Sequence, residues 1–171
     1  QYSVTKNIYK AYFGDTLAEP IRLEWKDKSI EFYPLNFAIP SVSVAKNAIT
    51  YVDAWKDADL QYNVTSRQLK EKIILKTAIA ANSYSFLVKP IGVNLVKEPD
   101  GSISVYDAIQ GEKLWSLPAP YVEDSAVDPQ VSNAVTMELR QEGESQYIDL
   151  SIDQIWLNDP SRVFPVTLDP T

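Results

Sequence analysis

The clearest pattern in the chain is a pair of alternating runs on either side of a polar stretch at residues 65–68. Before this stretch, Leu60, Tyr62 and Val64 alternate with polar residues, which puts their side chains on one face of a strand. A second alternating run, residues 69–75, follows it. Two such runs joined by a short polar segment predict a β-hairpin.

One residue interrupts the apolar face of the return strand. Glu71 stands in line with Leu69, Ile73 and Leu75. A carboxylate on a core face costs several kcal/mol unless it meets hydrogen-bond donors or a cation. We therefore expect either a bulge that shifts the register or a partner for Glu71. As a structural residue Glu71 would be a buried charge, and as a functional one it would be a general acid with a raised pKa. The candidate cationic partners are Arg22, Arg140 and Arg162.

Similar short alternating runs recur along the whole chain, with turn residues between them. Residues 98–101, Glu-Pro-Asp-Gly, are the strongest turn signal, because proline presets the backbone and glycine accepts a positive φ. About ten short strands, a single helical turn at residues 154–157 and no long amphipathic helix predict an all-β fold, an antiparallel β-sandwich. Outside the hairpin, the short apolar or alternating runs from which this number is judged lie at residues 21–25, 30–32, 42–44, 49–51, 84–88, 93–96, 103–106, 113–117, 135–139, 148–152 and 163–168.

The composition restricts the chemistry that the chain could perform. It contains no cysteine and no histidine, which excludes thiol nucleophiles, disulfides, histidine bases and histidine-ligated metals within these residues. An enzyme built from this chain would depend on carboxylates, lysine or tyrosine. A carboxylate-pair glycosidase is the enzyme alternative, but no pattern pairs two acids across a cleft.

Length and charge set the expected domain organisation and partners. The 171 residues suit a single β-sandwich domain, with residues 1–45 as an N-terminal arm or as extra strands. The net charge is −7 and no basic stripe is present, so nucleic acid is not an expected partner. No apolar run is long enough to span a membrane. Because the chain starts at Gln1, we expect a fragment of a larger multidomain protein, with neighbouring domains of that polypeptide as partners.

Acidic residues gather at two places that could bind calcium through carboxylate oxygens. The first group is Asp53, Asp57 and Asp59, and the second is the loop at residues 123–128. Neither contains the glycine and closing glutamate of an EF-hand. We expect no cofactor other than this possible calcium, and solvated acidic loops are the alternative interpretation.

Four tryptophans and ten tyrosines raise the possibility of a carbohydrate-binding surface. Aromatic residues also favour strands and bury large areas, so core packing is the alternative for each. Trp25 alternates with apolar neighbours and fits the core. Trp115 and Tyr121 are the candidate glycan contacts on the surface.

Three segments together resemble a known type of module. They are residues 59–62 with 69–75, residues 117–121 (Leu-Pro-Ala-Pro-Tyr), and the ending 164–171 (Phe-Pro-Val-Thr-Leu-Asp-Pro-Thr). In this order they resemble the β-rich module of Gram-positive wall-associated and RHS (YD-repeat) surface proteins, of the kind found upstream of DNRLRE-type domains. The resemblance covers residues 49–171. It implies a secreted or cell-wall location, with a toxin-presenting protein as one form, and carries no catalytic motif.

Taken together, the patterns and the resemblance predict a non-catalytic structural or interaction module of an extracellular bacterial protein. The alternative is a carbohydrate-binding module that recognises cell-wall or extracellular glycan. Because β-sandwiches perform both roles, the fold does not choose between them.

Overall fold

The computed structural model of the chain describes residues 1–6 and 8–170. Its regular structure is almost entirely antiparallel β-strand, which confirms the predicted all-β sandwich. The described residues form seventeen strands. This exceeds the predicted number because several strands are too short to show an alternating pattern. The predicted helical turn is present as α1, Gln154–Leu157.

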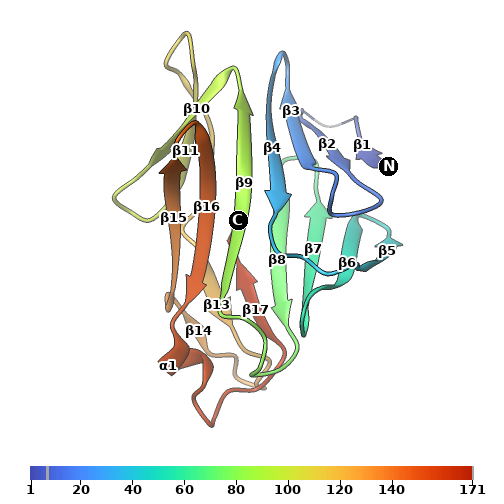
Figure 1. Cartoon of the computed structure of the whole chain (residues 1–171), viewed down its shortest axis with the longest axis vertical. Coiled ribbons are helices and arrows are strands. Elements are labelled where there is room, and N and C mark those ends of the chain that lie inside the picture. Colours follow the sequence, from blue (N-terminus) through green and yellow to red (C-terminus); the bar gives the residue numbers. More distant parts are fainter. Residues whose placement is uncertain (7, 171) are drawn as a thin grey trace.

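One seven-stranded sheet, here called the first sheet, has the strand order β1-β2-β3-β4-β9-β16-β15 (Figure 1). Its neighbouring strands are paired antiparallel, and β9 joins the N-terminal strands to the C-terminal hairpin β15–β16. The strands are β1 (Tyr2–Val4), β2 (Lys10–Phe13), β3 (Ile21–Trp25), β4 (Lys28–Pro34), β9 (Ser83–Ile91), β15 (Val135–Glu142) and β16 (Ser145–Ile152).

The second sheet also has seven strands, in the order β14-β13-β17-β8-β7-β6-β5. The predicted hairpin at residues 60–75 is its centre, formed by β7 and β8. Pro165 lies just before β17 rather than inside it, so the last strand can sit in the interior of the sheet. The strands are β5 (Ser41–Ala45), β6 (Ala48–Trp55), β7 (Ala58–Val64), β8 (Leu69–Leu75), β13 (Tyr121–Glu123), β14 (Val131–Ser132) and β17 (Val166–Asp169).

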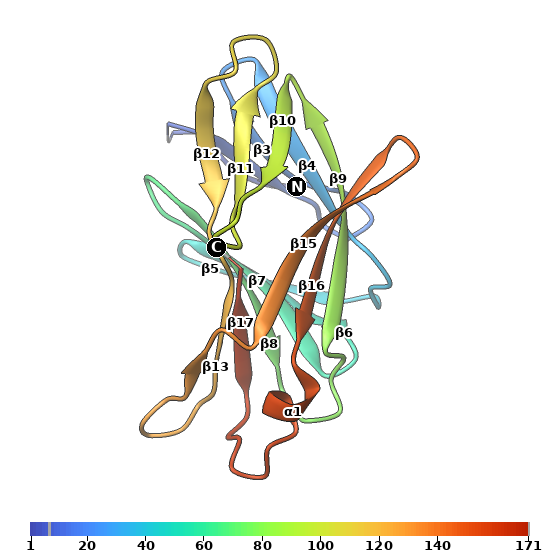
Figure 2. The same ribbon diagram turned by 90° about the vertical axis from the view of Figure 1, so that its left-hand side faces the viewer.

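A smaller third sheet stands at the upper end of the molecule in Figure 2. It consists of β10 (Val93–Lys97), β11 (Ile103–Asp107) and β12 (Lys113–Leu117). Gly92, with a φ of +72°, turns the chain from β9 into β10, and this left-handed conformation favours glycine. The Nζ of Lys28 lies 3.0 Å from Oδ2 of Asp107, which ties the third sheet to β4 of the first.

Aromatic rings join the first and second sheets face to face. Trp55 of β6 packs against Tyr84 and Phe86 of β9, with ring centroids 4.8 and 6.1 Å apart. Phe13 of β2 and Tyr62 of β7 are 5.6 Å apart. These rings are buried, so they contribute a large part of the apolar area that stabilises the sandwich.

The N-terminal residues 1–45 are part of both sheets. They supply β1 to β4 of the first sheet and β5 at the edge of the second. The hydroxyl of Tyr51 in β6 donates to the carbonyl oxygen of Gly14 at 2.8 Å, which connects the two sheets next to β2.

In the part of the chain that the structure describes, the helix α1 has four residues, and no helix is long and apolar enough to cross a membrane.

A buried carboxylate fixes the loops at the opposite end of the sandwich from the third sheet. Asp124 accepts hydrogen bonds through Oδ1 from the backbone N–H groups of Gln130 and Ala126, at 2.9 and 3.3 Å. Its Oδ2 accepts from Arg162 Nη1 at 3.2 Å and from the Val163 N–H at 3.4 Å. These N–H donors and the guanidinium hold the pKa of Asp124 below its usual range.

We expect Asp124→Asn to lower the free energy of unfolding by about 2–4 kcal/mol at pH 7. The amide NH2 group that replaces one carboxylate oxygen would face N–H donors and could not accept their hydrogen bonds. A urea titration measures this loss. The matched control, Asp128→Asn, changes an exposed acid of the same loop and should have little effect.

The pH dependence of this loss provides a second check. The stability that Asp124 contributes is present above its unfolded pKa and is lost as the pH falls through its lower folded pKa. The difference between wild type and Asp124→Asn should therefore shrink in acid. A difference independent of pH would contradict this account of Asp124.

Candidate functional site

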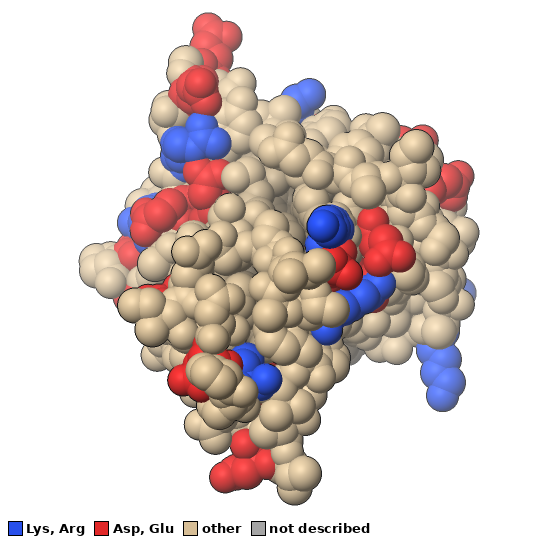
Figure 3. All heavy atoms as spheres, turned by 60° about the horizontal axis from the view of Figure 1, so that its bottom comes forward, with Lys and Arg blue, Asp and Glu red and all other residues tan. Residues whose placement is uncertain are grey.

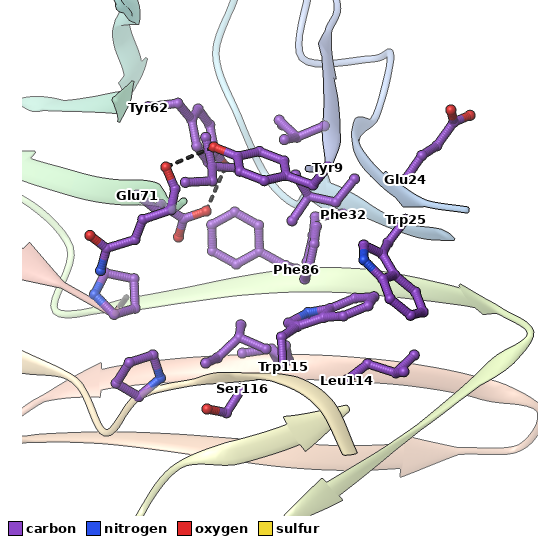
Figure 4. Close-up of a pocket in the computed structure, with 18 of the residues that line it drawn as sticks. Tyr9, Glu24, Trp25, Phe32, Tyr62, Glu71, Phe86, Leu114, Trp115 and Ser116 are labelled. Atoms are coloured by element: carbon purple, nitrogen blue, oxygen red, sulfur yellow. Dashed lines mark hydrogen bonds between the residues drawn. The ribbon is translucent and has the colours of Figure 1, made fainter. Parts of the chain in front are cut away.

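A cleft of about 340 Å³ lies between the first sheet, the second sheet and β12 (Figure 4). This volume lies at the lower end of the range for small-molecule sites. We call it the cleft and define it by its lining residues: Ile8, Tyr9, Ile21, Leu23, Glu24, Trp25, Phe32, Tyr62, Arg67, Gln68, Leu69, Glu71, Phe86, Leu114, Trp115, Ser116, Leu117, Pro118, Met137, Ile148, Leu150 and Pro170.

Apolar and aromatic side chains form the walls of the cleft. Figure 4 shows Trp25, Phe32, Phe86 and Trp115 around the cavity, contributed by β3, β4, β9 and β12. Trp25 and Trp115 are half-buried, so neither residue is fully enclosed by the core. Such walls suit an apolar or aromatic group.

A carboxyl group lies on the floor of the cleft. Glu71 of β8 is directly opposite Tyr62 of β7 in the antiparallel pairing, so their side chains share one face. The hydroxyl of Tyr62 donates to Oε2 of Glu71 at 2.5 Å. Burial raises the pKa of Glu71 to about 7, with a smaller contribution from the negative charge of Asp169, while the hydrogen bond from Tyr62 acts in the opposite direction.

The register predicted for Glu71 matches the structure, but the candidate arginine partners lie elsewhere. Ile73 and Leu75 are fully buried on the same face of β8 as Glu71. The partners of the three arginines are other acids: Glu24 for Arg22, Asp149 and Glu142 for Arg140, and Asp124 for Arg162.

The two candidate glycan contacts have different surroundings. Trp115 lines the cleft. Tyr121 of β13 is half-buried, and its hydroxyl donates to Oδ2 of Asp169 at 3.0 Å. Of these two residues, only Trp115 lines the cleft. The two rings therefore do not line one common binding site.

Two of the three candidate calcium ligands, Asp53 and Asp59, contact a lysine. The ammonium of Lys76 lies 2.6 Å from Oδ1 of Asp53 and 2.8 Å from Oδ1 of Asp59. Asp53 and Asp57 both have a φ of +56°, and the register of β6 against β7 shifts at this place. Within residues 1–6 and 8–170, no group of three or more acidic side chains is arranged to hold a metal ion. Calcium would have to displace Lys76, and its binding stays a prediction.

Few of the charged side chains around the cleft are positive. Glu24 meets Arg22 at 3.0 Å and Lys10 at 3.8 Å. Among the described lining residues, Arg67 is the single cationic side chain. Figure 3 shows another face of the molecule, where blue and red spheres form small mixed groups on a largely uncharged surface. Neither place offers the extended positive area that phosphate groups require.

Sequence reasoning found Glu71 and Trp115 but missed most of the remaining cleft. Trp25 alternates with Ile21 and Leu23, which predicted a core position, yet it lies at the end of β3, where the cleft opens. Tyr9 belongs to a segment without alternation, and its hydroxyl donates to the carbonyl oxygens of the turn between β7 and β8. No sequence signal identified either residue as part of a site.

We expect Glu71→Gln to stabilise the protein at pH 8. A carboxyl pKa raised by burial gives stability that is complete below the unfolded value of 4.5 and is lost as the pH rises through about 7. The neutral amide avoids this loss, which is on the order of 3 kcal/mol. Urea titrations at pH 4.5 and pH 8 should show a small difference at the lower pH and a gain at the higher one.

The control for this measurement is Glu138→Gln, on an exposed position of β15. This substitution should leave the urea midpoint unchanged at both pH 4.5 and pH 8. A large loss of stability in Glu71→Gln at pH 8 would instead indicate that the ionised carboxylate has a stabilising partner, as the sequence suggested.

Millimolar calcium should leave the thermal midpoint of the wild-type chain unchanged, because the ammonium of Lys76 already bridges the carboxylates of Asp53 and Asp59. In Lys76→Met the same oxygens lack this ammonium, so any calcium effect should be larger there. A calcium-dependent rise in the wild-type midpoint would support the calcium prediction.

The chain is similar to three large bacterial proteins. They are the tRNA3(Ser)-specific nuclease WapA of Bacillus spizizenii, the tRNA nuclease WapA of Bacillus subtilis strain 168 and the tRNA(Glu)-specific nuclease WapA of Bacillus subtilis subsp. natto. Each is 32% identical over 130 residues, which is 73% of this chain. The chain spans about 6% of the length of these curated relatives. No family model and no solved structure matches it.

These names correct several predictions from the sequence. The resemblance to RHS and wall-associated repeat modules is wrong, because the relatives are named as WapA nucleases. The names also contradict the prediction that the chain is not an enzyme, together with its two assigned roles, a non-catalytic structural module and a carbohydrate-binding module. The expectation that nucleic acid is no partner conflicts with relatives named for tRNA. The chain is thus similar to a short stretch of large tRNA nucleases.

Proposed function

We propose that this chain is a segment of a large tRNA nuclease and that it forms a part common to nucleases with different tRNA specificity. The observation that carries the proposal is the match to relatives named for two different tRNAs. One is named as specific for tRNA3(Ser) and another for tRNA(Glu), and each is 32% identical to this chain over 130 residues.

Residues that select a tRNA should differ between nucleases that select different tRNAs. Equal identity to both relatives therefore supports a place in the shared part of the enzyme. The surface chemistry agrees with this assignment. The cleft is apolar with a carboxyl group on its floor, and the chain has a net charge of −7, which disfavours reading a phosphate backbone here.

Glu71 is the residue of this segment that is best suited to proton transfer. A carboxyl group with a pKa of about 7 can accept or donate a proton at neutral pH. Cleavage of a phosphodiester also requires groups that stabilise developing negative charge. Arg67 is the single cationic side chain among the described lining residues, so the cleft is not proposed as the place where the tRNA is cut. In this proposal, the rest of the polypeptide supplies the groups that contact the phosphates of the tRNA.

The location and the partners of the chain are part of the proposal. Neighbouring parts of the same polypeptide are its partners, as expected for a segment of a much longer nuclease. The extracellular or cell-wall location expected from the sequence is retained as a proposal, and fractionation of the producing cells tests it.

An exchange of segments tests the proposed function. In the full-length protein, residues 1–171 are replaced by the matching stretch of Bacillus subtilis WapA, and cleavage is measured on a panel that contains tRNA(Glu) and serine tRNA. We expect the parent to cleave tRNA, and the hybrid to cleave the same tRNA at the same position with a rate within a few-fold.

The parent protein and the Bacillus relative, assayed side by side, are the controls. A hybrid that acquires the tRNA preference of the donor would show that this segment selects the substrate. A full-length parent that cleaves no tRNA would contradict the proposal as a whole.

A further inference from the structure

The cleft is bordered by a strand whose outer edge has no strand partner in the described part of the chain. β12 pairs with β11 on one side and is the last strand of the third sheet. It also contributes Leu114, Trp115 and Ser116 to the wall of the cleft. A strand edge offers backbone N–H and C=O groups to an incoming extended peptide, and pockets beside the edge can accept its side chains.

The mouth of the cleft lies next to this edge. The exposed lining residues are at β12, at the turn between β7 and β8, and just before β2, represented by Ser116, Arg67 and Ile8. Ile8 is 73% exposed, which is high for a large apolar side chain at the rim of an apolar cavity. An extended segment along β12 would cover these residues and remove their apolar area from water.

The floor of the cleft favours a positive or hydrogen-bond-donating group. Glu71 accepts from the hydroxyl of Tyr62, and its ionised form places a negative charge on the floor of the cleft. The negative charge of Asp169 acts on Glu71 and raises its pKa, so a cation bound nearby would relieve this repulsion. This complementarity fits a lysine or arginine beside an apolar side chain and disfavours the phosphates of an RNA strand.

We propose that an extended segment of the same polypeptide, from outside residues 1–171, pairs with the free edge of β12 and places an apolar side chain, flanked by a lysine or arginine, in the cleft. This inference rests on the proposed function, which takes the chain to be part of a large nuclease. The matched stretch makes up 6% of each relative, so such a polypeptide contains ample chain to supply the segment.

The absence of cysteine from these residues allows a specific test. Ser116→Cys places one thiol on the exposed side of β12 at the cleft. Its alkylation by N-ethylmaleimide is followed by mass spectrometry in the isolated 171-residue chain and in the full-length protein. We expect alkylation to be at least about tenfold slower in the full-length protein, since a docked segment exposes the thiol only when it opens.

Two further variants make the result specific to the cleft. Ser151→Cys, on an exposed position of β16, should react at the same rate in both proteins. Adding Leu114→Asp to Ser116→Cys in the full-length protein places a charge in the apolar wall and should restore fast alkylation. Equal rates for Ser116→Cys in the two proteins would overturn the proposal.

A photo-crosslink identifies the occupant. Trp115 is replaced by p-benzoylphenylalanine in the full-length protein, which is irradiated with and without tRNA. We expect a crosslink within one polypeptide, to a segment outside residues 1–171 that has an apolar residue next to a lysine or arginine. A crosslink only to tRNA, only to a second molecule, or only within residues 1–171 would contradict the proposal.

Cleavage of tRNA by the same full-length preparation separates the two proposals. Active enzyme with an unprotected thiol at position 116 would overturn the docked segment and leave the nuclease assignment intact. A protected thiol in a protein that cleaves no tRNA would support a docked segment while contradicting the nuclease assignment.

Discussion

The antiparallel pairing of β7 with β8 fixes both the centre of the second sheet and the chemistry of the cleft. This register places Tyr62 opposite Glu71 and turns both side chains toward the space between the sheets. A shift by one residue would send Glu71 to the opposite face and replace it with a lysine. The position of the carboxyl group is therefore a consequence of strand pairing and not of a separate catalytic loop.

Aromatic packing explains why the space between the sheets is filled at one place and open at another. Around Trp55, rings of the two sheets meet at distances typical of edge-to-face contacts, and this region is closed to solvent. Toward β12 the facing side chains surround a cavity instead. The ion pair between Lys28 and Asp107 holds the third sheet on β4, so β12 forms the remaining wall.

The similarity to tRNA nucleases changes which occupant is expected in the cleft, while the residues that line it stay the same. An apolar cavity in an isolated β-sandwich invites a search for a small ligand. The matched stretch makes up about 6% of each relative, so under the proposed function the rest of a longer polypeptide is the expected source of an occupant for this cavity. The acidic floor and the edge strand are compatible with a peptide occupant, whereas the tRNA phosphates need positive charge that this segment does not concentrate.

The sequence by itself determined the fold class, the central hairpin and the exceptional position of Glu71. These features follow from side-chain alternation with a period of two, which is local and can be read along one strand. The turn at Glu98 to Gly101 was also readable, because proline and glycine restrict the backbone locally. Short strands such as β13 and β14 gave no such signal, since two or three residues cannot show alternation.

Only the tertiary structure decided which residues surround Glu71 and form the cleft. Trp25, Phe86 and Trp115 come from strands far apart in the sequence, and their meeting depends on how three sheets pack. The same holds for partners: Glu71 accepts from Tyr62, while Arg162 binds Asp124 and Lys76 sits between Asp53 and Asp59. Alternation specifies the face of the sheet on which a side chain lies. The residues that it meets from the facing sheet depend on how segments far apart in the sequence pack together.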